Sequence, residues 1–278
     1  MNVRRLLAEG QDALAGTEVP ALEATILLGH VLGRDRAWFY AHPEADVAET
    51  EAARYRALLQ RRREGEPVAY LTGVREFWSL ELRVTPAVLI PRPETELLVE
   101  TALQRIPADA ECRVADLGTG SGAVALAIAT ERPACDVHAP ELDADALAIA
   151  RANAERLLPG RVRFHSGSWC EPLSGKFRLV ASNPPYVDAS DPHLRQGDCR
   201  FEPRAALTPG ADGLAAIRAI AVQAGAVLEP GGWLVFEHGL EQGPASRALL
   251  EALGYEDVET RLDLAGHERV TLGRRPAA

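Results

Sequence analysis

Apolar residues follow a helical spacing over roughly the first 64 positions of the chain. Two sets recur at intervals of three or four residues, each on one face of a helix: Val3, Leu6, Leu7 and Leu14, and then Leu22, Ile26, Leu27 and Val31. A third helical stretch spans residues 48–63 and ends in three arginines, which form either a solvated helix terminus or a phosphate-binding patch. The pattern predicts a helical N-terminal region.

The periodicity changes after a turn and linker predicted at residues 66–73. Residues 77–84 are aromatic and alternate between apolar and polar, which is typical of a short hairpin. We place a domain boundary near Arg75, so that residues 1–75 form a helical domain with its linker and residues 76–278 form a second domain.

Short apolar strands alternate with helices throughout the second domain. Strands are predicted at residues 114–117, 137–141, 162–165, 179–181 and 233–236 and near Val258 and Val270, with a turn at 229–232. Helices are predicted to begin near Glu94 and to span residues 123–130, 144–158, 214–228 and 244–253. This alternation predicts an α/β fold with an open, doubly wound sheet of seven strands.

Composition and charge restrict the partners. The chain has 278 residues, 47% of them hydrophobic, a formal net charge of −10 and a pI near 5.3, which argue against an extensive phosphate-binding surface. The four cysteines and seven histidines share no metal-like spacing. No apolar run approaches the roughly 20 residues that span a bilayer. We expect a cytoplasmic protein with reduced thiols and no metal, membrane or direct nucleic-acid partner.

The run Gly118-Thr119-Gly120-Ser121-Gly122 follows an apolar strand and precedes a helix. Glycines allow a ligand to approach the backbone closely, and the first turn of a helix has free N–H donors. This run predicts a nucleotide-type cofactor loop. Because it also fits a dinucleotide fingerprint, NAD(P) remains a competing ligand.

Asp116 lies two residues before the first glycine, where its carboxylate would repel a pyrophosphate but attract an amino-acid ammonium group. Glu141 ends the next predicted strand about twenty residues past the loop, where an acid can accept hydrogen bonds from ribose hydroxyls. Trp169 follows the third strand and either stacks on adenine or packs in the core. A cofactor with a methionine-type tail fits this set better than NAD(P).

The sequence Asn183-Pro184-Pro185-Tyr186 directly follows the strand at residues 179–181. Asn183 has a carbonyl acceptor, and prolines lack an N–H, so that nearby carbonyls remain free to accept hydrogen bonds. Tyr186 adds a flat face for stacking. The tetrapeptide is either a site for a planar NH2 group or an ordinary Pro-Pro turn.

Two further segments are candidates for substrate contact. Arg92 lies between two prolines at the start of a helix and either closes over a ligand or is simply solvated. Residues 187–207 form a polar, proline-rich connection that is long for a β–α loop, and such loops are commonly lids.

Taken together, these motifs and Leu228-Glu229-Pro230-Gly231-Gly232 resemble class I S-adenosylmethionine-dependent methyltransferases over residues 76–278, whose sheet is Rossmann-like. The whole chain is similar to the peptide chain release factor glutamine N5-methyltransferases, including the stretch 90–96 and residues 197–203. The ribosomal-protein glutamine methyltransferases share Asn-Pro-Pro-Tyr but usually lack the Pro-Arg-Pro-x-Thr-Glu pattern. Two departures from the family are Glu141, where Asp is usual, and Ser168, where an acid is frequent.

The resemblance implies S-adenosylmethionine as cofactor, S-adenosylhomocysteine as product, and a class-one release factor as the protein substrate. The cofactor would contact Asp116, Gly118, Thr119, Gly120, Ser121, Gly122, Glu141, Trp169 and Asn183. The glutamine of the Gly-Gly-Gln loop would meet Asn183, Pro184, Pro185, Tyr186 and Arg92, with Asn183, Pro184 and Tyr186 in catalytic roles. Rival interpretations are a DNA or RNA adenine methyltransferase, which would need a basic groove, and a non-catalytic module that keeps the fold.

Overall fold

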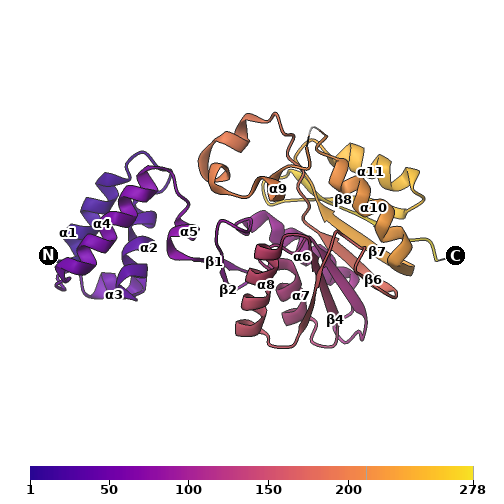
Figure 1. Ribbon diagram of the computed structural model, residues 1–278, viewed down its shortest axis with the longest axis horizontal. Coiled ribbons are helices and arrows are strands. Elements are labelled where there is room, and N and C mark those ends of the chain that lie inside the picture. The colour runs from indigo at the N-terminus through magenta and orange to yellow at the C-terminus, as the bar shows by residue number, and fades with distance from the viewer. Residues whose placement is uncertain (211, 278) are drawn as a thin grey trace. The chain divides into compact units, whose positions relative to one another are not determined.

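The computed structural model describes residues 1–210 and 212–277 of the chain (Figure 1). Its contacts divide the chain into two compact units, Met1–Val74 and Arg75–Ala278. Each unit has a hydrophobic core of its own.

The first unit is built from helices. Its helices are α1 (Val3–Ala13), α2 (Pro20–Leu32), α3 (Arg36–Ala41), α4 (Glu49–Arg63) and α5 (Val68–Thr72). The core of this unit includes Leu6, Leu27 and Leu28, together with the fully buried Tyr55. Leu22 and Ile26, which the spacing grouped with Leu27, are 45% and 42% exposed.

Two local predictions for this unit are corrected by the structure. Residues 68–72 form the short helix α5 instead of a linker, because Pro67 precedes its first turn and Gly73 ends it in a left-handed conformation. The arginines that end α4 are not simply solvated. Arg61 pairs with Glu66 and Arg62 with Glu23, and the Arg62 side chain is only 14% exposed.

The second unit contains a seven-stranded sheet and a two-stranded one. The small sheet pairs β1 (Val74–Phe77) with β2 (Leu80–Arg83), as the hairpin pattern predicted. The strands of the large sheet are β3 (Arg113–Leu117), β4 (Asp136–Glu141), β5 (Val162–Ser166), β6 (Phe177–Ser182), β7 (Leu228–Glu237), β8 (Glu256–Leu262) and β9 (Glu268–Arg274). Their order is β5-β4-β3-β6-β7-β9-β8, with β9 antiparallel to both of its neighbours.

Helices connect these strands. They are α6 (Glu96–Arg105), α7 (Ala123–Glu131), α8 (Ala144–Leu157), α9 (Arg204–Leu207), α10 (Ala215–Val227) and α11 (Gly243–Ala252), with the 3₁₀ helices η1 (Pro93–Thr95), η2 (Pro192–Arg195) and η3 (Gly197–Phe201). The strand order reverses between β3 and β6, so the carboxyl ends of these strands meet at a topological switch point. The predicted seven-stranded, doubly wound fold is confirmed.

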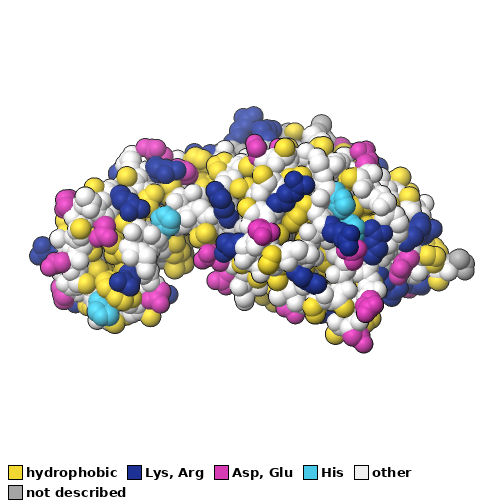
Figure 2. Space-filling model, turned by 60° about the horizontal axis from the view of Figure 1, so that its bottom comes forward, with side chains coloured by type: hydrophobic (Ala, Val, Ile, Leu, Met, Phe, Trp, Pro, Cys, Tyr) yellow, Lys and Arg dark blue, Asp and Glu magenta, His cyan; other side chains and the backbone are white. Residues whose placement is uncertain are grey.

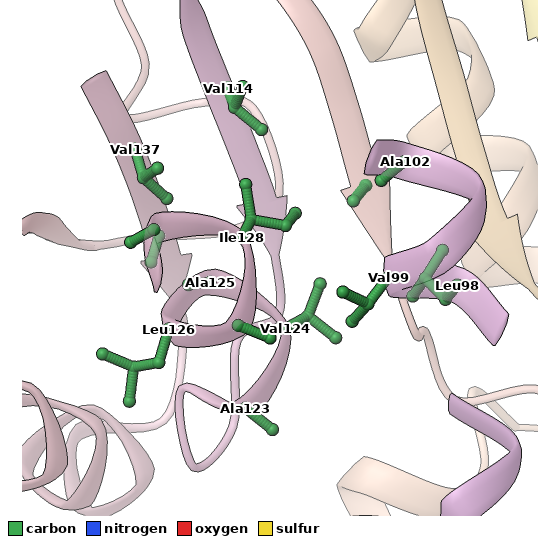
Figure 3. Packing of buried hydrophobic residues seen from close by; sticks show 14 of the residues in the cluster. Leu98, Val99, Ala102, Val114, Ala123, Val124, Ala125, Leu126, Ile128 and Val137 are labelled. Atoms are coloured by element: carbon green, nitrogen blue, oxygen red, sulfur yellow. The ribbon is translucent and has the colours of Figure 1, made fainter. Parts of the chain in front are cut away.

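Helix α7, which directly follows the glycine loop, is buried on every side. The residues from Ala123 to Ala129 are all buried, and α7 packs between the sheet and α6. Figure 3 shows Val124 of α7 facing Val99 of α6, with Ile128 beside the strands that carry Val114 and Val137. A helix that is apolar on every side must be covered on every side.

The turn predicted at residues 229–232 lies inside a strand. Strand β7 begins at Leu228, and its pairing with β6 shifts register between Phe177 and Leu179. Gly231 adopts a φ of +75°, and a β-bulge of this kind absorbs the irregularity without ending the strand.

On the face shown in Figure 2, acidic and basic side chains are interspersed on both units. Within the described residues, no helix combines the length and apolar character that a membrane crossing requires.

Candidate active site

A cavity of about 390 Å³ opens where the large sheet changes strand order. Its lining comes entirely from the second unit, between Ala87 and Ala206. Among the predicted site residues, those that line it are Arg92, Asp116, Gly118, Thr119, Gly120, Ser121, Glu141, Trp169, Asn183 and Pro185. The structure therefore brings both sequence motifs to one cavity.

The glycine loop connects β3 to α7 with a backbone that few other residues could adopt. Gly118, Gly120 and Gly122 have φ values of +68°, +56° and +87°. A Cβ atom on Gly118 would lie 3.0 Å from Cζ3 of Trp169, whereas one on Gly120 would meet no protein atom within 4 Å. Gly122 caps α7 and does not line the cavity.

Two carboxylates hold this loop. Oδ2 of Asp116 accepts hydrogen bonds from the Thr119 hydroxyl at 2.6 Å and the Ala125 N–H at 3.1 Å. Burial raises the pKa of Asp116 to about 6, against these two hydrogen bonds, which lower it. Oε2 of Glu141 accepts from the Gly120 N–H at 2.9 Å, and its Oε1 accepts from the next two backbone N–H groups. These three hydrogen bonds use three of the roughly four acceptor positions of a carboxylate, so Glu141 keeps capacity for about one ligand hydroxyl.

Trp169 lies between the cavity and the core, and its stacking on adenine stays a prediction. Its ring lines the cavity beside Gly118, and it also packs against the buried cluster that includes Phe177 and Phe236. Its φ of +47° is unusual for a residue other than glycine.

Asn183 extends the line of β6 into the cavity, and its carboxamide is oriented by a neighbour. The Nδ2 group donates a hydrogen bond to the Thr95 hydroxyl at 3.0 Å. With the NH2 group engaged there, the carbonyl oxygen Oδ1 is the end of the carboxamide left to accept a hydrogen bond from a ligand.

The other residues of the tetrapeptide differ in position. Pro185 lines the cavity, but Pro184 and Tyr186 are outside the set of described residues that line it. The Tyr186 hydroxyl donates a hydrogen bond to Oε1 of Glu237 at 3.0 Å. The main-chain carbonyl of Tyr186 accepts a hydrogen bond from Nε2 of Gln242. Burial, reinforced by Glu237, raises the pKa of Tyr186. A stacking role for Tyr186 stays a prediction.

Arg92 lines the cavity and is not simply solvated, and its closing over a ligand stays a prediction. Its guanidinium forms an ion pair with Glu202, whose side chain is fully buried and also accepts from the Ile90 N–H at 3.0 Å. Burial raises the pKa of Glu202, and Arg92 opposes that rise. Residues Pro203, Ala205 and Ala206 line the cavity, so this ion pair ties the long connection after β6 to the cavity wall.

Sequence reasoning missed Thr95, Glu202 and Glu237 as site residues. Glu237 had a usable signal, because it is an acid directly after the predicted strand 233–236, at the same sheet edge as Asn183. Thr95 and Glu202 lie in the stretches 90–96 and 197–203 that carry the family resemblance, but the tertiary contacts through which they act cannot be read from those stretches. Within the described residues, no group of three or more His, Cys, Asp or Glu side chains could hold a metal ion.

Comparison with known proteins agrees with this geometry. Residues 5–73 match the PrmC N-terminal domain family, and residues 93–198 match the Methyltransferase small domain family. A methyltransferase from Pyrococcus furiosus has the same fold, with a TM-score of 0.55 at 18% identity, over 80% of this chain and 98% of that one. The fold and the cavity together define a methyltransferase with a Rossmann-like sheet.

The curated relatives specify the class further. The release factor glutamine methyltransferase of Salmonella typhimurium is 50% identical over 275 residues, and that of Escherichia coli is 48% identical over 275 residues. Both alignments cover 99% of this chain and 99% of the relative. The chain belongs to the release factor glutamine methyltransferase family, as the motifs predicted.

Proposed function

We propose that this chain transfers a methyl group from S-adenosylmethionine to the side-chain amide nitrogen of the Gly-Gly-Gln glutamine in a class-one peptide chain release factor. The observation that carries the proposal is that the glycine loop and Asn183 line one cavity. The names of the relatives, release factor glutamine methyltransferases, support the same acceptor.

The residues present fit S-adenosylmethionine. The side chain of any residue other than glycine at position 118 would press on Trp169, so this part of the loop can meet a ligand only as backbone. The Asp116 carboxylate suits the ammonium group of the methionine tail, and Glu141 suits the ribose hydroxyls. We assign Asp116, Gly118, Thr119, Gly120, Ser121, Gly122, Glu141, Trp169 and Asn183 to this ligand. When bound, it supplies an electrophilic methyl group on a sulfonium centre, and S-adenosylhomocysteine is the product.

Asn183 and Pro184 orient the acceptor. An amide nitrogen is a poor nucleophile because its lone pair is delocalised, so the residues act chiefly by holding the nitrogen in line with the methyl group. Oδ1 of Asn183 and the main-chain carbonyl of Pro184 accept hydrogen bonds from the two N–H groups of the glutamine amide. Both acceptors stabilise the positive charge that develops on nitrogen. Pro185, Tyr186 and Arg92 complete the proposed substrate contacts.

Residues 1–75 serve as the docking domain for the release factor, and residues 76–278 carry out the methyl transfer. The helical unit has its own core and contributes no residue to the cavity lining. Exposed apolar side chains on α2, among them Leu22 and Ile26, give it a surface suited to a protein partner. A release factor substrate places the reaction in the cytoplasm.

The test offers S-adenosylmethionine with a labelled methyl group separately to a release factor, to the ribosomal-protein target and to duplex DNA. We expect label on the release factor in large excess over the other two. Preferential labelling of the ribosomal protein would assign the chain to the sibling activity, and labelling of DNA adenine would replace the proposed acceptor altogether.

A further inference from the structure

A buried carboxylate, that of Glu237, lies beside Asn183 at the edge of the large sheet. Strands β6 and β7 are parallel neighbours, and their register pairs Ser182 with Phe236. The residues that follow this pair, Asn183 and Glu237, therefore leave the same edge of the sheet side by side. Glu237 is 2% exposed and does not line the cavity.

One oxygen of this carboxylate has a hydrogen-bond partner, and the other has none among the residues that the structure describes. The Tyr186 hydroxyl donates to Oε1 at 3.0 Å. Oε2 is buried and unpartnered. Burial raises the pKa of Glu237, and the hydroxyl groups of Thr95 and Tyr186 oppose that rise.

Thr95 contacts the carboxamide and has a proton to offer the carboxylate. Its oxygen accepts a hydrogen bond from Nδ2 of Asn183, and it has one proton of its own to donate. The strand register places Glu237 beside Asn183, and the unpartnered Oε2 of Glu237 is an acceptor suited to that proton. A carboxylate can only accept, so it makes Thr95 a donor toward Glu237 and leaves the Thr95 oxygen to accept from Asn183. Hydrogen bonds in such a series also polarise one another.

We propose that Glu237 and Thr95 are positioning residues that hold the Asn183 carboxamide with its oxygen toward the methyl acceptor. An inverted carboxamide would present its NH2 group to the NH2 group of the glutamine, donor against donor. The network therefore selects an acceptor that carries N–H bonds. This inference rests on the proposed function and adds two residues to it.

The variants Thr95→Val and Glu237→Gln break the network in different ways. Thr95→Val keeps the shape of the side chain and removes the hydroxyl. In Glu237→Gln, the NH2 group of glutamine can donate to the Thr95 oxygen. The Thr95 hydroxyl then donates toward position 183, which favours the inverted Asn183 carboxamide with its oxygen facing Thr95. Each should lower kcat about tenfold, since roughly one net hydrogen bond separates the two orientations. Affinity for S-adenosylmethionine should change little, and Thr95→Ser should recover turnover.

Thr101→Val is the matched control. Thr101 lies on α6, six positions after Thr95, is equally buried, and donates its hydroxyl to the Leu97 carbonyl at 2.7 Å, within its own helix. Its replacement removes a buried hydroxyl without touching the network and should leave kcat unchanged.

The decisive measurement repeats Thr95→Val and Glu237→Gln in an Asn183→Asp background. The two oxygens of aspartate are equivalent, so orientation no longer matters, and each added substitution should change the remaining kcat less than about twofold. Equal losses in both backgrounds, or unchanged kcat in the Asn183 background, would overturn the proposal. If Glu237→Gln does not fold, Thr95→Val in the two backgrounds decides alone. Absence of release factor methylation by the unsubstituted chain would refute the proposed function instead.

Discussion

Replacement of Gly120 by valine separates the cofactor site from the stability of the fold. Gly120 has a φ of +56°, and an L-residue in this conformation costs roughly 1–2 kcal/mol. A Cβ atom at this position meets no protein atom within 4 Å, so no clash with the protein adds to that strain. Because Gly120 lines the cavity, the new side chain occupies space that the ligand needs.

We therefore expect Gly120→Val to fold with a modestly lower melting temperature and to lose S-adenosylmethionine affinity by about a hundredfold or more, equivalent to roughly 3 kcal/mol. Gly160→Val is the matched control. Gly160 has a φ of +74°, a Cβ atom there would likewise meet no protein atom within 4 Å, and it does not line the cavity.

Calorimetric titration with S-adenosylmethionine and thermal unfolding of both variants make the comparison. The two should lose similar stability, while only Gly120→Val loses binding. Unchanged affinity in Gly120→Val would remove the loop from the cofactor site, and an equal loss in Gly160→Val would trace the effect to backbone strain.

Three further outcomes are expected. Asn183→Ala should lower kcat on the order of 10²–10³-fold at unchanged cofactor affinity, since one oriented polar contact is lost. Asn183→Asp should retain more activity than Asn183→Ala. Equal rates of the unsubstituted chain and both variants in steady-state assays would contradict this. Removal of residues 1–74 should spare calorimetric cofactor binding and weaken methylation of intact release factor, and normal methylation would refute docking. Cofactor affinity should fall about tenfold per pH unit below about pH 6, because the Asp116 carboxylate that meets the ammonium group takes up a proton below its raised pKa. Asp116→Asn should bind the cofactor weakly, with an affinity that does not change with pH. A wild-type affinity that stays constant between pH 5 and 7 would exclude that contact.

The parts of the fold that could be predicted from the sequence are those with a local cause. The strand before Gly118 and the strand before Asn183 are short apolar runs that end in residues with special backbone properties, and both appear at the expected edge of the sheet. The helix that the spacing of Leu22, Ile26 and Leu27 predicts is present as α2, but Leu22 and Ile26 are exposed, because helical spacing identifies a face without showing how wide its covered part is.

The contacts that orient the site residues lay beyond prediction. Thr95 is 88 positions from Asn183, and Arg92 is 110 positions from Glu202. Such pairs depend on which strands are neighbours and on how the connection after β6 folds back, and neither is encoded in a short pattern. The available signals were the acid at Glu237 directly after an apolar strand and the two stretches, 90–96 and 197–203, that contain Thr95 and Glu202.

The central claim is that the methyl group goes to the nitrogen of one glutamine. Intact release factor is incubated with the chain and methyl-labelled S-adenosylmethionine, and the peptide that contains Gly-Gly-Gln is fragmented by mass spectrometry. We expect a single labelled methyl group on the side-chain nitrogen of that glutamine, and none when the glutamine is replaced by glutamate in the release factor. A methyl group on another residue, or label that survives the replacement, would contradict the account.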